Sequence, residues 1–337
     1  MTIGYVIEPK RVDTVLRCML VLVLASIVSL STAPTADQLA AASKYNAEHG
    51  GVSFLVIHQG KKIAENYPGR GSETRTWELA SGTKSFTGVM ALCAQEDGLL
   101  KLDEPVSKTI TEWQADDRRE ITIRQLLSLV SGIPGREERG LALQVPSYSE
   151  AINAHAKFKP GARFQYGPTP FMAFGELMRR KLLPNREGVL QYLERRVFKP
   201  LTMQHGFWKL DRDGNPHLPS GAHMSAREWS KFGLMILAGG KGVLKSESVN
   251  ELFRTTKANP SYGLSWWLPA EGGLQPDGFR HWNWPKSLPT DVHVAAGAGG
   301  QRLYVVPSRD LIVVRQAPIR VKDDFEDADF LSKLFLR

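Results

Sequence analysis

Trp77-Glu78-Leu79-Ala80-Ser81-Gly82-Thr83-Lys84-Ser85-Phe86 is the stretch that says most about this chain. Apolar residues continue from it to Cys93 and predict a helix with a buried face. Ser81 and Lys84 are three residues apart, so they lie on one face of such a helix. A serine at the first turn also lies near free backbone N–H groups and the positive end of the helix dipole, which stabilise an oxyanion. This arrangement favours acyl transfer.

The spacing also provides a base for the serine. A serine hydroxyl must lose its proton before it attacks a carbonyl, and an amine can accept that proton only when it is neutral. Burial favours the neutral form of a lysine by lowering its pKa. Apolar neighbours such as Phe86 and Met90 therefore predict that Lys84 is the base. The alternative is a solvated serine cap followed by a surface lysine, because both residue types are common.

Further motifs follow in order along the chain. They are Asp103-Glu104-Pro105-Val106, residues 121–127, Ser131-Gly132, Lys159-Pro160-Gly161, Tyr166, Pro200-Leu201-Thr202-Met203, Tyr262-Gly263-Leu264 and Gly297-Ala298-Gly299-Gly300-Gln301. Together with the Ser-x-x-Lys segment, this series resembles the serine β-lactamase and penicillin-binding-protein superfamily, specifically its class C-like esterases, amide hydrolases and 6-aminohexanoate-oligomer hydrolases. The resemblance runs from about residue 51 to residue 316. It implies the class C β-lactamase-like α/β (α+β) fold, an antiparallel sheet flanked by helices with an inserted, mostly helical region.

The resemblance implies the rest of the catalytic site. Tyr166 matches the tyrosine that passes the proton to the leaving group, although Pro168 stands where the family often has an asparagine. The glycine-rich segment lacks the side chains of the family's usual Lys-Thr-Gly. Its backbone implies an oxyanion-hole donor at Ala298, or alternatively Gly297, beside the N–H of Ser81. A purely structural tyrosine packed under the preceding turn is the other interpretation of Tyr166.

Four residues are candidates for the substrate pocket. Gly299 and Gly300 would let a ligand approach the backbone closely. Trp282 and Trp284 would add an apolar surface for acyl or alkyl groups, and core packing explains the tryptophans equally well. Arg302 is a candidate cation for a substrate carboxylate.

Composition and charge bear on the number of domains and on the kinds of partner and cofactor that we expect. The 337 residues, 42% hydrophobic and 23% charged, can form one large domain or two closely packed ones. The net charge of +8 is spread over scattered basic residues, so we expect no nucleic-acid partner. Strands rather than a helix are predicted after the glycines, and the cysteines and histidines lack metal-site spacing. We therefore expect neither a nucleotide cofactor nor a metal.

The N-terminus has the order of a secretory signal. Basic residues up to Arg17 precede the apolar run 18–30, and small residues follow to Ala36. The run is shorter than the ~20 residues of a transmembrane helix. We expect residues 1–36 to be a signal peptide, and 37–337 to be an exported periplasmic or extracellular hydrolase domain. An uncleaved anchor, which would be the chain's membrane contact, is the alternative.

Hydrophobic periodicity and turn residues predict the arrangement of the domain. The sheet is expected from about residues 50–70 and 260–317, with a helical region at about 110–255 between them. Predicted strands cover 52–58, 61–65, 262–268 and a hairpin at 301–316. Predicted helices cover 35–49, 122–130, 147–158, 169–183, 187–198, 225–240 and 325–335.

These observations predict an exported serine hydrolase that cleaves a small ester or amide through an acyl-Ser81 intermediate. The alternatives are a β-lactamase, a D-Ala-D-Ala peptidase acting on cell-wall peptide, and a catalytically silent envelope protein that binds such a peptide. The missing Lys-Thr-Gly side chains favour the silent protein.

Overall fold

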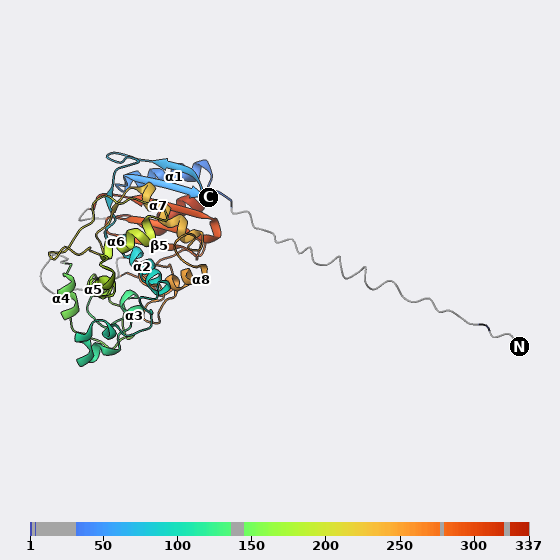
Figure 1. The fold of residues 1–337 in the computed structure, drawn as a ribbon. Helices are drawn as coiled ribbons and strands as arrows, with labels where there is room; N and C mark the ends of the chain where they lie inside the picture. The colour runs from blue at the N-terminus through green and yellow to red at the C-terminus, as the bar shows by residue number, and fades with distance from the viewer. Residues whose placement is uncertain (2–3, 5–31, 136–144, 277–279, 320–323, 337) are drawn as a thin grey trace. The chain divides into compact units, whose positions relative to one another are not determined.

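The computed structural model describes residues 1, 4, 32–135, 145–276, 280–319 and 324–336 (Figure 1). The chain divides into two units, Met1–Thr32 and Ala33–Arg337, and the fold below is that of the second. The apolar run of the expected signal peptide lies outside the described residues. Within the described ranges, no helix combines the length and the apolar character needed to cross a membrane.

A five-stranded antiparallel sheet organises this unit, with the strand order β2-β1-β7-β6-β5. Its strands are β1 (Ser53–His58), β2 (Lys61–Asn66), β5 (His293–Gly297), β6 (Gln301–Val306) and β7 (Leu311–Gln316). The pairing of β1 with β7 joins the two ends of the domain, with Leu55 opposite Val314. The prediction of one sheet built from distant segments is confirmed, and β5 forms one of its edges.

Helices cover both faces of the sheet, which explains why β1, β6 and β7 are buried along their whole length. On one face lie α1 (Ala36–Glu48) and α9 (Asp327–Phe335). The Phe330 ring of α9 contacts Phe54 of β1 and Tyr304 of β6, at centroid distances of 6.0 and 5.9 Å. The opposite face carries α7 (Ala226–Leu237), as Figure 1 shows.

The segment between β2 and β5 is mostly helical, as predicted. It contains the short sheet of β3 (Trp77–Glu78) and β4 (His223–Met224) and the helices α2 (Lys84–Glu96), α3 (Ile123–Leu127), α4 (Tyr148–Asn153), α5 (Thr169–Leu182), α6 (Val189–Leu193) and α8 (Ser246–Val249). The predicted helix starts at Thr35, Thr122 and Ser147 each carry a capping box, although α3 and α4 end earlier than expected.

The strand predicted at residues 262–268 is wrong. Ser265 has a φ of 72°, which reverses the chain, and the N–H of Gly263 donates to the carbonyl of Trp266 at 2.9 Å. Only an isolated bridge joins this segment to β5, where Trp267 and Val294 exchange hydrogen bonds of 3.0 and 2.8 Å. Residues 262–268 therefore form a tight turn in place of the extended strand that was expected.

The first residue of β5 is a half-buried histidine, His293. The His293 imidazole stacks on the Phe253 ring at a centroid distance of 3.5 Å and an interplanar angle of 13°. Burial lowers the pKa of His293 to about 4. The folded protein therefore holds this ring neutral over a range in which an unfolded histidine, with a pKa near 6.5, becomes protonated.

This difference predicts a loss of stability in acid. As the pH falls from 6.5 towards 4, the unfolded chain binds the His293 proton before the folded chain does, so the free energy of unfolding decreases. We expect this site to contribute a loss of about 2 kcal/mol by pH 5. His293→Phe keeps the ring stack and should remove that contribution when urea unfolding is compared at pH 7 and pH 5. His281→Gln, at an exposed histidine, is the control and should retain the wild-type pH dependence. Equal pH dependence of wild type and His293→Phe would contradict the prediction.

Candidate active site

Ser81 lies in a single turn of 3-10 helix, Ala80–Thr83, that leads directly into α2. The sequence analysis placed Ser81 in the first turn of the helix, but in the structure Ser81 lies just before α2. Ala80 has a φ of 45°, which is sparsely populated by residues with a side chain. The Thr83 hydroxyl donates to the Ala80 carbonyl at 2.7 Å, and the Gly82 N–H donates to the Leu79 carbonyl at 2.9 Å. These bonds hold the turn in its unusual conformation.

Lys84 points its amine at the serine. Its Nζ lies 2.8 Å from the Oγ of Ser81 and donates to the Pro219 carbonyl at 3.0 Å. The Lys84 side chain belongs to the buried core, with 4% of its surface exposed, whereas Ser81 is half-buried. A solvated surface lysine is therefore excluded, and the two residues have the geometry of a nucleophile beside a base.

The segment that supplies the Pro219 carbonyl is hydrogen-bonded to Thr83, at the end of the 3-10 turn, and to Thr87, in α2. The N–H of Ala222 donates to the Thr83 hydroxyl at 3.2 Å, and the Thr87 hydroxyl donates to the Leu218 carbonyl at 3.4 Å. Sequence analysis missed this partner because a backbone carbonyl has no residue-type signature. The structure thus limits the movement of the Lys84 amine from two sides.

Tyr166 lies beside the same amine. The centroid of its ring is 4.9 Å from the Lys84 Nζ, and the Phe171 ring lies 5.4 Å from that nitrogen. Trp267 packs on Tyr166 at 5.2 Å and is fully buried, so for Trp267 core packing is the correct interpretation. The Pro168 position is explained by the fold, because this proline caps the start of α5.

The glycine-rich strand touches the nucleophile turn. A Cβ on Gly297 would lie 2.1 Å from the Leu79 carbonyl oxygen and 3.1 Å from the backbone nitrogen of Ser81, so only glycine fits. Gly297 is the last residue of β5, and Ala298 follows it as an exposed residue. Both candidates for the second oxyanion donor therefore belong to the backbone that reaches Ser81.

Gly299 and Gly300 complete the turn from β5 to β6. Both are buried, with φ values of 75° and 68°. Their carbonyls accept hydrogen bonds of 3.1 and 2.7 Å from the guanidinium of Arg315, which is 0% exposed. Gly299 and Gly300 are therefore buried turn residues bound to Arg315. The sequence analysis missed Arg315, because an arginine within an apolar strand is normally expected to face solvent.

The predicted tryptophans form an aromatic pair of their own in the loop before β5. Trp282 and Trp284 are half-buried, and their rings meet edge to face at 5.2 Å. The Trp284 indole N–H donates to the Pro289 carbonyl at 2.9 Å. Their place in the substrate pocket stays a prediction.

Arg302 does not face a substrate, and that expectation is wrong. It is only 8% exposed, and its guanidinium pairs with Asp327 of α9 at 2.6 Å. It also donates to the Gly297 carbonyl at 3.0 Å. Arg302 points towards the α9 face of the sheet because its carboxylate partner lies there.

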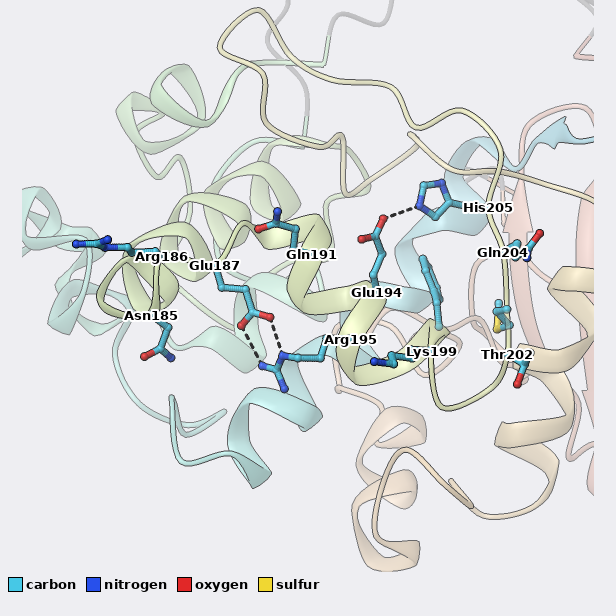
Figure 2. A pocket seen from close by; sticks show the side chains of 12 residues that line it. Asn185, Arg186, Glu187, Gln191, Glu194, Arg195, Lys199, Thr202, Gln204 and His205 are labelled. Carbon is cyan, nitrogen blue, oxygen red and sulfur yellow. Dashed lines mark hydrogen bonds and ion pairs between the residues drawn. The ribbon is translucent and has the colours of Figure 1, made fainter.

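A groove of about 1130 Å³ lies along α6 and the loop that follows it (Figure 2). Four of its ionisable side chains form two pairs, Arg195 with Glu187 at 2.7 Å and His205 with Glu194 at 2.9 Å. None of its lining residues is Ser81 or Lys84. Large volume alone does not make a reactive site, so Ser81 and Lys84 remain the candidate catalytic residues.

Known proteins share this fold and parts of this sequence. The chain is 28% identical over 176 residues to Protein flp of Staphylococcus aureus (strain MW2), a match that covers 47% of this chain and 35% of that protein. It thus spans about a third of that relative's length. EstCE1, a hydrolase with promiscuous acyltransferase activity, superposes with a TM-score of 0.71 at 15% identity, over 89% of this chain and 97% of EstCE1. A D-stereospecific amidohydrolase from Streptomyces sp. superposes with a TM-score of 0.66 at 19% identity, over 89% of this chain and 98% of that one.

The family assignment rests on a longer match. The sequence model of the Beta-lactamase family aligns with residues 36–332, which include the Ser81 turn, the Tyr166 segment and β5. With the mixed α/β fold of its structural neighbours and a serine hydrogen-bonded to a buried lysine, this match shows that the chain belongs to the beta-lactamase family.

Proposed function

We propose that this protein is an exported serine hydrolase that cleaves a small ester or amide through an acyl-Ser81 intermediate. The observation that carries the proposal is the 2.8 Å contact between the Lys84 Nζ and the Ser81 Oγ, beside a strand backbone that reaches the same turn. The fold is shared with a hydrolase and an amidohydrolase, which supports acyl transfer as the reaction class.

The proposed reaction has two halves, acylation of Ser81 and hydrolysis of the acyl-enzyme, and Lys84, Tyr166 and the oxyanion donors act in both. Neutral Lys84 accepts the hydroxyl proton while the Ser81 Oγ forms a bond to the substrate carbonyl carbon. The carbonyl electrons move to oxygen, where the N–H groups of Ser81 and Ala298 stabilise the charge. The carbonyl then re-forms, the bond to the leaving alcohol or amine breaks, and that group receives the proton through Tyr166. Water repeats the sequence on the acyl-enzyme, releases the acid and restores Ser81.

The side chains around the turn favour neutral substrates. A β-lactam would need donors for its side-chain amide and a cation for its carboxylate. Pro168 has no side-chain donor, Ala295 and Ala296 have none, and Arg302 is committed to Asp327. A charge-assisted hydrogen bond contributes about 1.5 to 3 kcal/mol, so the missing carboxylate partner should weaken binding by about tenfold to a hundredfold.

A silent peptide-binding protein is the second candidate. It is favoured by the same missing side chains, because binding could persist where turnover is lost. The two candidates differ in one respect, since only a hydrolase needs a reactive serine. Labelling by a fluorophosphonate probe therefore separates them, and a folded protein that takes up no label at Ser81 would favour the silent binder.

The first prediction concerns the catalytic pair. Ser81→Ala and Lys84→Ala should each lower kcat by about a thousandfold or more, and the double variant should cost little beyond either, because groups that act as a unit are not additive. Steady-state hydrolysis of p-nitrophenyl butyrate measures this. Ser107→Ala, at a buried serine that donates to the Arg119 carbonyl at 2.8 Å, is the control and should keep its activity. Full activity in a folded Ser81→Ala protein would end the proposal.

The second prediction concerns substrate class. On one preparation, kcat/KM should be higher for p-nitrophenyl butyrate than for nitrocefin, because the ester needs only the nucleophile and the oxyanion donors. Both reactions are followed by absorbance, with Ser81→Ala as the blank. A higher efficiency on nitrocefin would show that the pocket holds a carboxylate after all, and the assignment would change to a β-lactamase.

The third prediction concerns export. The charged, apolar and small-residue order of the first 36 residues supports cleavage by a signal peptidase. The capping box of α1 uses Thr35, so a cut before this residue would keep the helix start intact. We expect mature protein from producing cells to begin between Thr32 and Asp37 and to lie outside the cytoplasmic membrane. A mass that retains Met1 in a soluble cytoplasmic fraction would contradict this.

A further inference from the structure

The oxyanion donor and the carbonyl held by Arg302 belong to one peptide unit. The carbonyl of Gly297 and the N–H of Ala298 are joined by the same planar bond, and in a trans peptide the two point in opposite directions. Arg302 Nη1 donates to that carbonyl at 3.0 Å and to the Gln301 carbonyl at 3.0 Å. The orientation of the carbonyl therefore sets the direction in which the Ala298 N–H points.

Arg302 is itself held firmly. Its Nε and Nη2 donate to the two carboxylate oxygens of Asp327 at 2.6 and 2.9 Å, which is the bidentate geometry of a strong ion pair. The Tyr304 hydroxyl donates to the same carboxylate at 2.5 Å, and Asp327 is 5% exposed. A buried charge with this many partners has little freedom, so the bond to Gly297 comes from a fixed point.

We propose that Arg302 is a positioning residue that orients the Ala298 N–H towards the oxyanion. The proposal rests on the function proposed above and deepens it. The hydrogen bond from Arg302 holds the Gly297 carbonyl on the α9 side of the sheet. The Ala298 N–H, at the other end of the same peptide unit, then points away from the protein interior, on the side where Ala298 is exposed. Preorganised donors of this kind lower the barrier because they need no rearrangement during the reaction.

A second buried arginine strengthens the same turn. Arg315 Nη1 donates to the carbonyls of Gly299 and Gly300, and its Nη2 donates to the His49 carbonyl at 2.7 Å. The carbonyls of Gly299 and Gly300 lie in the turn between β5 and β6, and without Arg315 they would be freer to rotate with their glycines. Arg302 acts on the peptide unit that carries the donor, and Arg315 acts on the units that follow it.

Arg302→Lys tests this, with Arg118→Lys as a matched control. Arg118 is 5% exposed, pairs with Asp116 at 2.6 Å and donates to the carbonyls of Ile152 and Ala154 at 2.7 and 2.9 Å, so it is the same kind of buried arginine. Lysine keeps the charge and loses the planar fork that serves carboxylate and carbonyl together. On p-nitrophenyl butyrate, Arg302→Lys should lower kcat by about tenfold or more with KM changed by less than about threefold. Arg118→Lys should leave both constants within about twofold, at a similar loss of melting temperature.

A double variant distinguishes positioning from general loosening. Ala298→Pro removes the N–H itself and should lower kcat by about a hundredfold or more. If Arg302 acts through that N–H, Arg302→Lys should lower kcat by less than about twofold further in the Ala298→Pro protein. Multiplied effects, or an equal fall in kcat for Arg118→Lys, would overturn the proposal.

Two further measurements keep the test decisive. If Arg302→Lys does not fold, Asp327→Asn is the alternative, because it weakens the ion pair with Arg302 while keeping the shape of residue 327. The same fall in kcat at constant KM is expected in this variant. A wild-type kcat in Asp327→Asn would overturn the proposal. Fluorophosphonate labelling of the wild-type protein separates the two hypotheses. Labelled, active wild type with an unaffected Arg302→Lys variant refutes the positioning role alone, whereas wild type without label or turnover refutes the hydrolase on which it rests.

Discussion

The contact between the backbone of β5 and the backbone of the Ser81 turn is the constraint on which the site depends. A side chain at Gly297 would collide with the Leu79 carbonyl, so the strand can come this close only with a glycine there. Since β5 is an edge strand, one of its sides is paired with β6 and the other is available to the turn. This approach places the β5 backbone beside the backbone nitrogen of Ser81, a contact that α2 by itself could not provide because the backbone groups of a helix point along its own axis.

Placing a lysine inside the protein imposes a second requirement. α2 is buried on every side from Lys84 to Ala94, so the amine must find polar partners in the core. It finds the Ser81 hydroxyl and the Pro219 carbonyl, while the rings of Tyr166 and Phe171 exclude water from its remaining surface. Thr83, just before α2, and Thr87, within it, bind residues 222 and 218 and keep that carbonyl in place. The geometry of Ser81 and Lys84 therefore depends on a loop that lies 135 residues beyond Lys84 in the sequence.

Elements from the two ends of the domain contact the strands that carry the backbone beside Ser81. β1 pairs with β7, and α9 packs over β1 and β6 through Phe330. Asp327, on α9, holds Arg302, which in turn bonds the Gly297 carbonyl. A continuous chain of contacts thus runs from the C-terminal helix to the backbone beside Ser81. Truncation of α9 would remove packing and an ion pair at once, which links the stability of the sheet to the geometry of its edge.

Sequence patterns by themselves determined the local parts of this protein: the Ser-x-x-Lys spacing, the helix starts at Thr35, Thr122 and Ser147, and the hairpins of β1–β2 and β6–β7. These depend on interactions between residues a few positions apart, which periodicity and turn chemistry reveal. The order of predicted strands and helices indicated one sheet built from distant segments, in agreement with the fold that the family resemblance implied. Only the tertiary structure decided what Arg302, Arg315 and Pro219 do, and that residues 262–268 turn back instead of forming a strand. An arginine in a strand can face solvent, substrate or a buried carboxylate, and a backbone carbonyl looks the same at every position. Their partners are therefore set by the packing of elements that lie 15 to 135 residues apart in the sequence.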